Sequence, residues 1–247
     1  MTEFCLQLNP SKTEIMVVGP QRVLNKISLH GIQLQDDVCI RFKSSTKSLG
    51  ILLDETLSFK NHVIKLKQDC FRLIRNISKM RFIFTRDQLK TIVNSLIVCK
   101  LDYCNGLFTG IDEKWVKELQ RIQNAAGKVV YGLYKYDRVG DTLQNLHWLP
   151  VQERIDYKVL LIVFKCLNGI GPEYLTDMLT YKSYGHNIRL AESHMNTAMG
   201  ERAFQNYAPK KWNSMPLSIT ECTTLASFKS CLKTHMFKVA YGIDPQM

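Results

Sequence analysis

A change of hydrophobic period near residue 60 constrains the fold of this chain more than any other feature. Across residues 62–81, apolar side chains recur every three or four positions, which is the spacing of one face of an α-helix. This apolar stripe consists of Val63, Leu66, Cys70, Leu73, Ile77 and Met80. On a helical wheel the opposite face is cationic, with Lys65, Arg72, Arg75 and Lys79. The spacing predicts a long amphipathic helix.

The residues before this helix read as short strands. The β-rich or alternating segments are 13–18, 27–34, 38–42 and 49–53. His30-Gly31 interrupts the second segment, and we expect a hairpin turn at that point. Four such strands predict a small antiparallel or mixed sheet in the first 60 residues.

The chain after the first helix carries several helix-boundary signals. Thr85 and Gln88 have the spacing of a capping box, so we expect a helix to begin there. Its apolar stripe is Leu89, Ile92, Val93, Leu96 and Ile97. Asp112 is the expected N-cap of the next helix, and Gly132 is its expected end. The stripe of that helix is Trp115, Leu119, Ile122, Ala126 and Val129.

The last third of the chain predicts two more helices separated by a polar stretch. One helix begins near Leu149-Pro150 and ends at Asn168-Gly169, and the other covers residues 225–239. Residues 180–200 show no periodicity and are expected to form a long loop.

Strands followed by helices predict an α+β fold that is mostly α. We expect a β-rich part at residues 1–60 and a helical part at 61–136. A second helical region, with the long loop near 180–200, is expected at residues 137–247.

Composition narrows the possible partners. The chain has 33 Lys and Arg against 22 Asp and Glu, a formal net charge of +11. A basic excess favours polyanions, although many basic proteins bind none. No cysteine pair has C-x-x-C spacing, and no segment reads as a signal peptide or a membrane span. We therefore expect a soluble intracellular protein with reduced thiols, in the nucleus or the cytoplasm, and no membrane partner.

Six stretches, in order, carry a resemblance to a known family. They are Leu8-Asn9-Pro10-Ser11-Lys12-Thr13-Glu14; Leu49-Gly50-Ile51-Leu52-Leu53-Asp54 with His62; Leu101-Asp102-Tyr103-Cys104-Asn105; Leu119-Gln120 with Ile122-Gln123-Asn124; Leu146-His147-Trp148-Leu149-Pro150-Val151 with Arg154; and Ala208-Pro209 with Trp212-Asn213. Together they resemble the C-terminal part of LINE-type (jockey/CR1-like) non-LTR retrotransposon reverse transcriptases. The resemblance implies the end of a palm, a thumb and a C-terminal region.

The resemblance also implies that this chain lacks the polymerase's catalytic centre. In the family, the catalytic aspartates that hold two metal ions precede the segment that here begins seven residues after Met1. Asp36-Asp37 is preceded by Gln33-Leu34-Gln35 and falls after Lys12, so we interpret it as an exposed turn. We expect no polymerase activity from this chain alone. Mg²⁺ is expected only in an intact polymerase, and this chain is expected to hold no cofactor.

Three sets of residues are candidates for function. By the resemblance, Lys12 lies near the incoming triphosphate of an intact enzyme, a role that is vestigial without the metals. Leu49 and Gly50 match the hairpin that grips the primer, although a glycine at a strand bend explains them equally well. The cationic face of the first helix is expected either to follow a phosphate backbone or to be merely solvated.

The remaining candidates have simpler interpretations. Trp115 and Trp148 are expected in the core, and His147 has no neighbouring nucleophile or acid in the sequence. His186 and His194 do not have metal-site spacing.

The resulting hypothesis is a reverse-transcriptase part with residual affinity for an RNA/DNA template–primer and no small-molecule substrate. The alternatives are a non-enzymatic protein-interaction scaffold and a retroelement-derived reading frame without function.

Overall fold

The computed structural model describes residues 9–28, 30–33, 39–134, 136–184 and 187–243. The chain divides into two compact units, Met1–Lys65 and Leu66–Met247. In the described part of the chain, no helix is both long and apolar enough to cross a bilayer. The mixture of small antiparallel sheets and predominant helix confirms the predicted α+β, mostly α, fold class.

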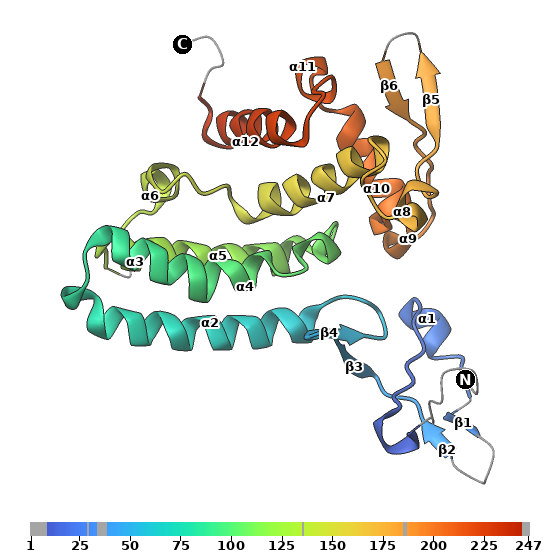
Figure 1. The fold of residues 1–247 in the computed structure, drawn as a ribbon. Coiled ribbons are helices and arrows are strands. Elements are labelled where there is room, and N and C mark those ends of the chain that lie inside the picture. The colour runs from blue at the N-terminus through green and yellow to red at the C-terminus, as the bar shows by residue number, and fades with distance from the viewer. Residues whose placement is uncertain (1–8, 29, 34–38, 135, 185–186, 244–247) are drawn as a thin grey trace. The chain divides into compact units, whose positions relative to one another are not determined.

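The first unit contains two separate two-stranded antiparallel hairpins (Figure 1). Its elements are η2 (Pro10–Lys12), α1 (Gln21–Leu24), β1 (Gly31–Gln33), β2 (Cys39–Arg41), β3 (Ser45–Ser48) and β4 (Ile51–Asp54), followed by the start of helix α2 (Lys60–Met80). Strand β1 pairs with β2, and β3 pairs with β4.

One predicted strand and one predicted turn in this unit are wrong. Residues 13–18 form only an isolated bridge, between Ile15 and Phe42. The expected turn at His30-Gly31 is also wrong, because Gly31 belongs to β1. A Cβ on Gly31 would lie 2.5 Å from the carbonyl oxygen of Ile40, so the glycine permits close strand approach instead of a turn. Asp36-Asp37 lies outside the described residues.

The second unit is helical apart from one hairpin. After α2 and η4 (Arg81–Ile83), its elements are α3 (Arg86–Val93), the π-helical turn η5 (Asn94–Val98), α4 (Cys99–Asp102), η6 (Asn105–Phe108), α5 (Glu113–Tyr131), α6 (Gly140–Asn145), α7 (Val151–Leu167), α8 (Glu173–Thr176), β5 (Tyr181–Tyr184), β6 (Asn187–Leu190), α9 (Ala198–Arg202), α10 (Phe204–Asn213), α11 (Leu217–Thr220) and α12 (Leu225–Tyr241).

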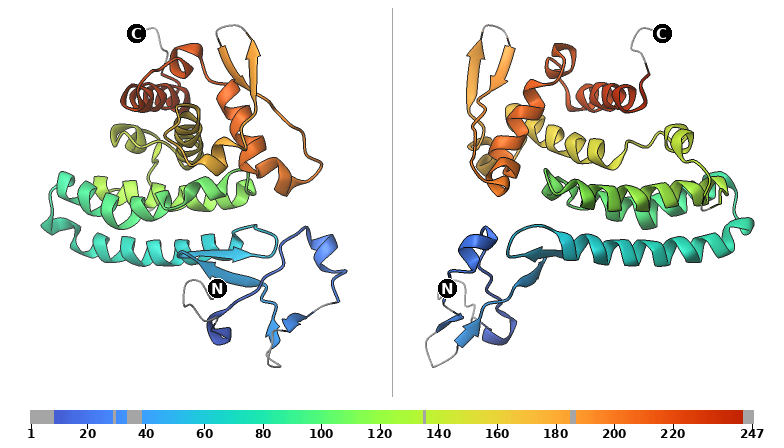
Figure 2. Two further views of the ribbon diagram at one scale, coloured as in Figure 1. Left: turned by 45° about the vertical axis from the view of Figure 1, so that its right-hand side comes forward. Right: turned by 180° about the vertical axis from the view of Figure 1, so that it is seen from behind.

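Helix α7 is the centre of this unit. Figures 1 and 2 show it between α5 on one side and α12 on the other, and it also contacts α10. Its buried residues include Val159, Leu160 and Val163, and the ring of Phe164 stacks on Phe228 of α12 with centroids 4.2 Å apart. A helix with neighbours on several sides loses the simple one-sided pattern of a surface helix, and α7 is accordingly apolar on most of its circumference.

The predicted helix boundaries in this unit are confirmed. Thr85 and Gln88 form a reciprocal capping box at α3. The side chain of Asp112 accepts a hydrogen bond from the Lys114 amide at the start of α5, and Gly132 ends that helix at φ 67°. A left-handed C-terminal residue explains why glycine occupies this position.

Two local predictions are corrected. Residues 180–200 are not one loop, because β5 and β6 form an antiparallel hairpin and α9 follows it. Asn213 of α10 holds this hairpin, since its side chain bonds both the amide and the carbonyl of Leu190. Leu96 is exposed instead of inward, because the π-helical turn shifts the register and buries Ile97 and Val98.

Candidate nucleic-acid interface and a basic pocket

Helix α2 carries the predicted cationic face. The side chains of Lys65, Arg72, Arg75 and Lys79 are all exposed. The buried side of the helix is formed by Val63, Cys70, Ile74 and Ile77. Met80, the last residue of the predicted apolar stripe, is 47% exposed and is therefore not part of this buried side. Burial raises the pKa of the Cys70 thiol to about 11, which keeps it protonated and unreactive.

The acidic content of α2 is low. The helix holds Lys60, Lys65, Lys67, Arg72, Arg75 and Lys79 but only one acid, Asp69. Asp69 pairs with Arg72 at 2.9 Å, with both side chains substantially exposed. An exposed pair of this kind contributes little energy, so the Asp69 contact holds Arg72 only weakly.

The two residues predicted to match a primer grip lie at the tip of the β3–β4 hairpin. Ser48 pairs with Ile51, which leaves Leu49 and Gly50 as a two-residue turn. Both residues have positive φ, 45° for Leu49 and 89° for Gly50. This is the backbone of a type I′ turn, in which leucine is unfavourable and Asn-Gly is preferred. Leu49 is nevertheless 87% exposed.

Replacing Leu49 with asparagine is expected to stabilise the first unit by about 0.5–1 kcal/mol, because asparagine tolerates the left-handed conformation. Hydrogen exchange of the β3 and β4 amides measures the change. Leu49→Ala keeps the strain and serves as the control. Equal stability of the two variants would show that the turn is not strained by its side chain.

Lys12 lies at the exposed end of η2. The turn before it is local, since the side chain of Asn9 accepts a hydrogen bond from the Ser11 amide at 3.1 Å. Among the described residues, no group of three or more His, Cys, Asp or Glu side chains is placed to hold a metal ion.

Two of the stretches that carry the resemblance meet in the second unit. Asp102 follows the π-helical turn, and Arg154 lies in the first turns of α7. The guanidinium of Arg154 binds the Asp102 carboxylate with two nitrogens, and its Nε lies 2.8 Å from Oδ1. Both side chains are largely buried. A bidentate pair of this type fixes the relative position of α4 and α7.

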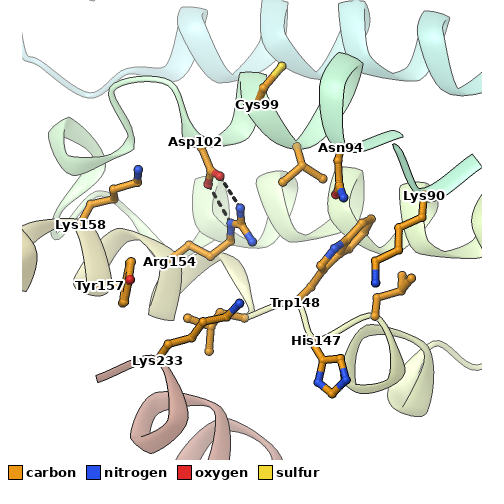
Figure 3. A pocket seen from close by; sticks show the side chains of 13 residues that line it. Lys90, Asn94, Cys99, Asp102, His147, Trp148, Arg154, Tyr157, Lys158 and Lys233 are labelled. Carbon is orange, nitrogen blue, oxygen red and sulfur yellow. Dashed lines mark hydrogen bonds and ion pairs between the residues drawn. The ribbon is translucent and has the colours of Figure 1, made fainter. Parts of the chain in front are cut away.

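This pair lines a pocket of about 590 Å³ (Figure 3). Its walls come from α3, the π-helical turn, α4, the turn between α6 and α7, α7 and α12. The lining is strongly basic, with Lys90, Arg154, Lys158 and Lys233 against Asp102. Aromatic side chains, His147, Trp148 and Tyr157, complete it.

A third stretch that carries the resemblance, in helix α5, supports the backbone at the start of α7. Gln120 of α5 accepts a hydrogen bond from the Val151 amide at 2.8 Å, at the start of α7. Gln123, which is fully buried, donates to the Leu149 carbonyl at 2.8 Å. These two glutamines satisfy backbone groups that the helix itself leaves unpaired. Their role is to position the pocket wall.

The two tryptophans that were predicted to lie in the core differ in burial. Trp148, in the turn before α7, is 5% exposed, which confirms its predicted burial. Trp115 of α5 is only partly buried. His147 is exposed and adopts φ 55°, a left-handed conformation that is uncommon outside glycine but that histidine, asparagine and aspartate adopt more often than other residues. Its ring lies 5.7 Å from that of Phe237.

Sequence reasoning did not find this pocket. Its basic residues are dispersed over more than 140 positions, from Lys90 to Lys233, and no two of them form a recognisable motif. The one available signal was the pair of resemblance stretches around Asp102 and Arg154, and their proximity is a property of the tertiary fold.

Comparison with known proteins gives no match to this chain among family models, curated proteins or solved structures. The resemblance therefore depends on its sequence motifs alone.

Proposed function

We propose that this chain is a non-catalytic part of a non-LTR retrotransposon reverse transcriptase that binds an RNA/DNA template–primer through helix α2. The observation that carries the proposal is the exposed cationic face of α2, Lys65, Arg72, Arg75 and Lys79, on a 21-residue helix that holds one Asp. Phosphate contacts need exposed, closely spaced cations, and a helix presents them at regular intervals along a backbone.

The buried side of α2 supports this assignment. Val63 and Cys70 are 0% exposed, so the helix is fixed to the protein by one side and presents its cations on the other. Lys67 is different from the face residues, because it pairs with Glu118 of α5 at 2.5 Å and is partly buried. Its charge serves packing within the second unit, and it is not assigned to the interface.

Reversing the charge of the whole face is expected to remove duplex binding. The variant combines Lys65→Glu, Arg72→Glu, Arg75→Glu and Lys79→Glu. We expect affinity for an RNA–DNA duplex to fall by roughly tenfold per side chain and the salt slope of log K to fall by about one per lost contact. Fluorescence anisotropy across a salt series measures both quantities.

The matched control reverses four exposed cations elsewhere, Lys117, Lys182, Arg189 and Lys229, with the same change in net charge. Equal loss in both variants would mean that only net charge matters and would contradict the assignment to α2. Extension of a primed RNA template by this chain with Mg²⁺ would contradict its non-catalytic character.

A protein-interaction scaffold is the second candidate. The observation that favours it is the turn from α2 to α3, where Phe82 is 82% exposed and Ile83 is 63% exposed. Large apolar side chains that are adjacent on a surface often mark a protein contact. Duplex binding that is absent from the unmodified chain and unchanged in both charge variants would favour this candidate.

A further inference from the structure

We infer that the basic pocket of the second unit binds a nucleotide, with its phosphate on the lysines and its base against the aromatic wall. The nucleotide is either free or the phosphorylated end of a strand. This inference goes beyond the proposed function, because no lining residue belongs to α2.

The lining of the pocket carries an excess of positive charge. The lining has four cations, Lys90, Arg154, Lys158 and Lys233, and one anion, Asp102, which leaves three positive charges. Among the described residues, Arg154 is the only one of these cations with an ion-pair partner. Like charges that line one cavity repel each other, so the arrangement is stabilised when an anion enters.

The position of the cations favours a phosphate over a single carboxylate. Lys90 comes from α3, Lys158 from α7 and Lys233 from α12, so the ammonium groups approach from separate elements. Figure 3 shows Arg154 and Lys233 on one side of the Trp148 ring and Lys90 on the other. Phosphate offers several oxygens and up to two negative charges, which donors from different directions can share.

The aromatic wall of the pocket favours a ligand that contains a nucleobase. Trp148, His147 and Tyr157 line the pocket beside Asn94, whose amide has both donor and acceptor groups. Nucleic-acid bases stack on such rings and bond to such amides. A volume of about 590 Å³ lies within the ordinary range of small-ligand pockets.

The backbone of the pocket wall is irregular at two places. The π-helical turn Asn94–Val98 contributes Asn94 and Val98, and His147 is held at φ 55°. π-helical turns and left-handed non-glycine residues each cost free energy and are concentrated at binding sites. The Tyr241 hydroxyl steadies the turn by donating to the Trp148 carbonyl at 2.6 Å.

The test is titration of the full chain with AMP, followed by calorimetry and by tryptophan fluorescence, to which Trp148 contributes. Lys90→Gln combined with Lys233→Gln is expected to weaken AMP binding by about a hundredfold, roughly tenfold for each charge-assisted bond. Lys229→Gln, an exposed lysine of the same helix α12 outside the pocket, is expected to leave affinity unchanged. Thermal unfolding of each variant establishes that it is folded.

Further ligands distinguish a free nucleotide from the phosphorylated end of a strand, and a nucleotide from a simple anion. Tighter binding of a 5′-phosphorylated dinucleotide than of AMP identifies the end of a strand as the source, and the reverse identifies a free nucleotide. Inorganic phosphate or malonate binding as tightly as AMP overturns the inference, because the base then contributes nothing. Absence of binding by AMP and by the dinucleotide also overturns it. The α2 charge-reversal variant is expected to keep AMP affinity, so failure of the proposed function leaves a distinct result here.

Discussion

Replacing Asp156 with alanine is expected to lower the free energy of unfolding of the second unit by about 3–5 kcal/mol, because it removes the anion from a buried polar network. Asp156 of α7 is 6% exposed. One carboxylate oxygen accepts from the Tyr207 hydroxyl at 2.5 Å, and the other lies 2.8 Å from the Lys211 ammonium. Both partners belong to α10, so the network joins α10 to the central helix.

The state of Tyr207 explains the large effect. Burial raises the pKa of its phenol, and the neighbouring Asp156 charge raises it further, so the hydroxyl remains a donor at all ordinary pH values. Without the carboxylate, this hydroxyl loses its strongest acceptor and Lys211 becomes a partly buried cation without a counter-ion. The remaining neighbour of the hydroxyl is the Gln152 amide, which lies 3.3 Å away as a donor. Removing one member of a buried pair costs more than the pair contributes.

Urea unfolding followed by tryptophan fluorescence measures this prediction, because Trp115, Trp148 and Trp212 all lie in the second unit. Asp177→Ala, an exposed aspartate after α8, is the matched control and is expected to change stability by less than about 0.5 kcal/mol. Asp156→Asn is expected to fall between the two. A loss below about 1 kcal/mol for Asp156→Ala would mean that α10 is held by its apolar contacts alone.

The helices were predictable because their signals are local. The capping box of Thr85 and Gln88 and the stop at Gly132 depend on residues within one or two turns, and the sequence contains all of them. The cationic face of α2 was predictable for the same reason, since it follows from helical spacing alone. These features needed no knowledge of the rest of the fold.

The strands were less predictable because their pairing is not local. Strand β3, Ser45–Ser48, is polar and has no apolar alternation, and it exists because β4 pairs with it. Residues 13–18 have the composition of a strand but make only one bridge. β-propensity describes a side chain on a paired surface, so it fails when the partner is absent or unexpected.

The basic pocket could not be predicted from the sequence, because its lining residues are also brought together by non-local packing. Asp102 and Arg154 are separated by 52 positions, and Lys233 comes from the last helix of the chain. Their meeting depends on the packing of α7 against α4 and α5 and on the packing of α12 against α7. Gln120 and Gln123, which belong to a stretch that carries the resemblance, support the backbone around this pocket.

The first unit has its own equivalent of the Asp156 network, and its removal is the second large effect we expect. Asp54, at the end of β4, accepts hydrogen bonds from the Ser58 amide at 2.9 Å and the Phe59 amide at 2.7 Å, and from both donors of Thr56. The turn it closes contains Leu57 at φ 49° and Phe59 at φ 56°, two left-handed residues without a glycine. One carboxylate therefore offsets the strain of the turn that leads into α2.

Asp54→Ala is expected to destabilise the first unit by about 3 kcal/mol, because one buried and several partly buried donors lose their acceptor. Burial raises the pKa of Asp54, but the hydrogen bonds from Thr56, Ser58 and Phe59 outweigh it and leave the pKa below the ordinary value. A lowered pKa means that this stabilisation is present above the ordinary aspartate pKa and is lost as the pH falls through the folded one. The unmodified unit should therefore lose stability in acid by a step that the alanine variant lacks.

Hydrogen exchange at the Ser58 and Phe59 amides measures both effects, since the tryptophans of the second unit do not report on the first. Glu55→Ala, the adjacent acid, is the matched control, and no side-chain hydrogen bond of Glu55 is found within the described residues.

Duplex binding by the Asp54→Ala variant shows whether the first unit contributes to the interface on α2. Binding that survives assigns the interface to Arg72, Arg75 and Lys79, which lie in the second unit, whereas binding that is lost shows that a folded first unit, which contains Lys65, is needed for it. Unchanged exchange at both amides would show that the turn folds without its carboxylate.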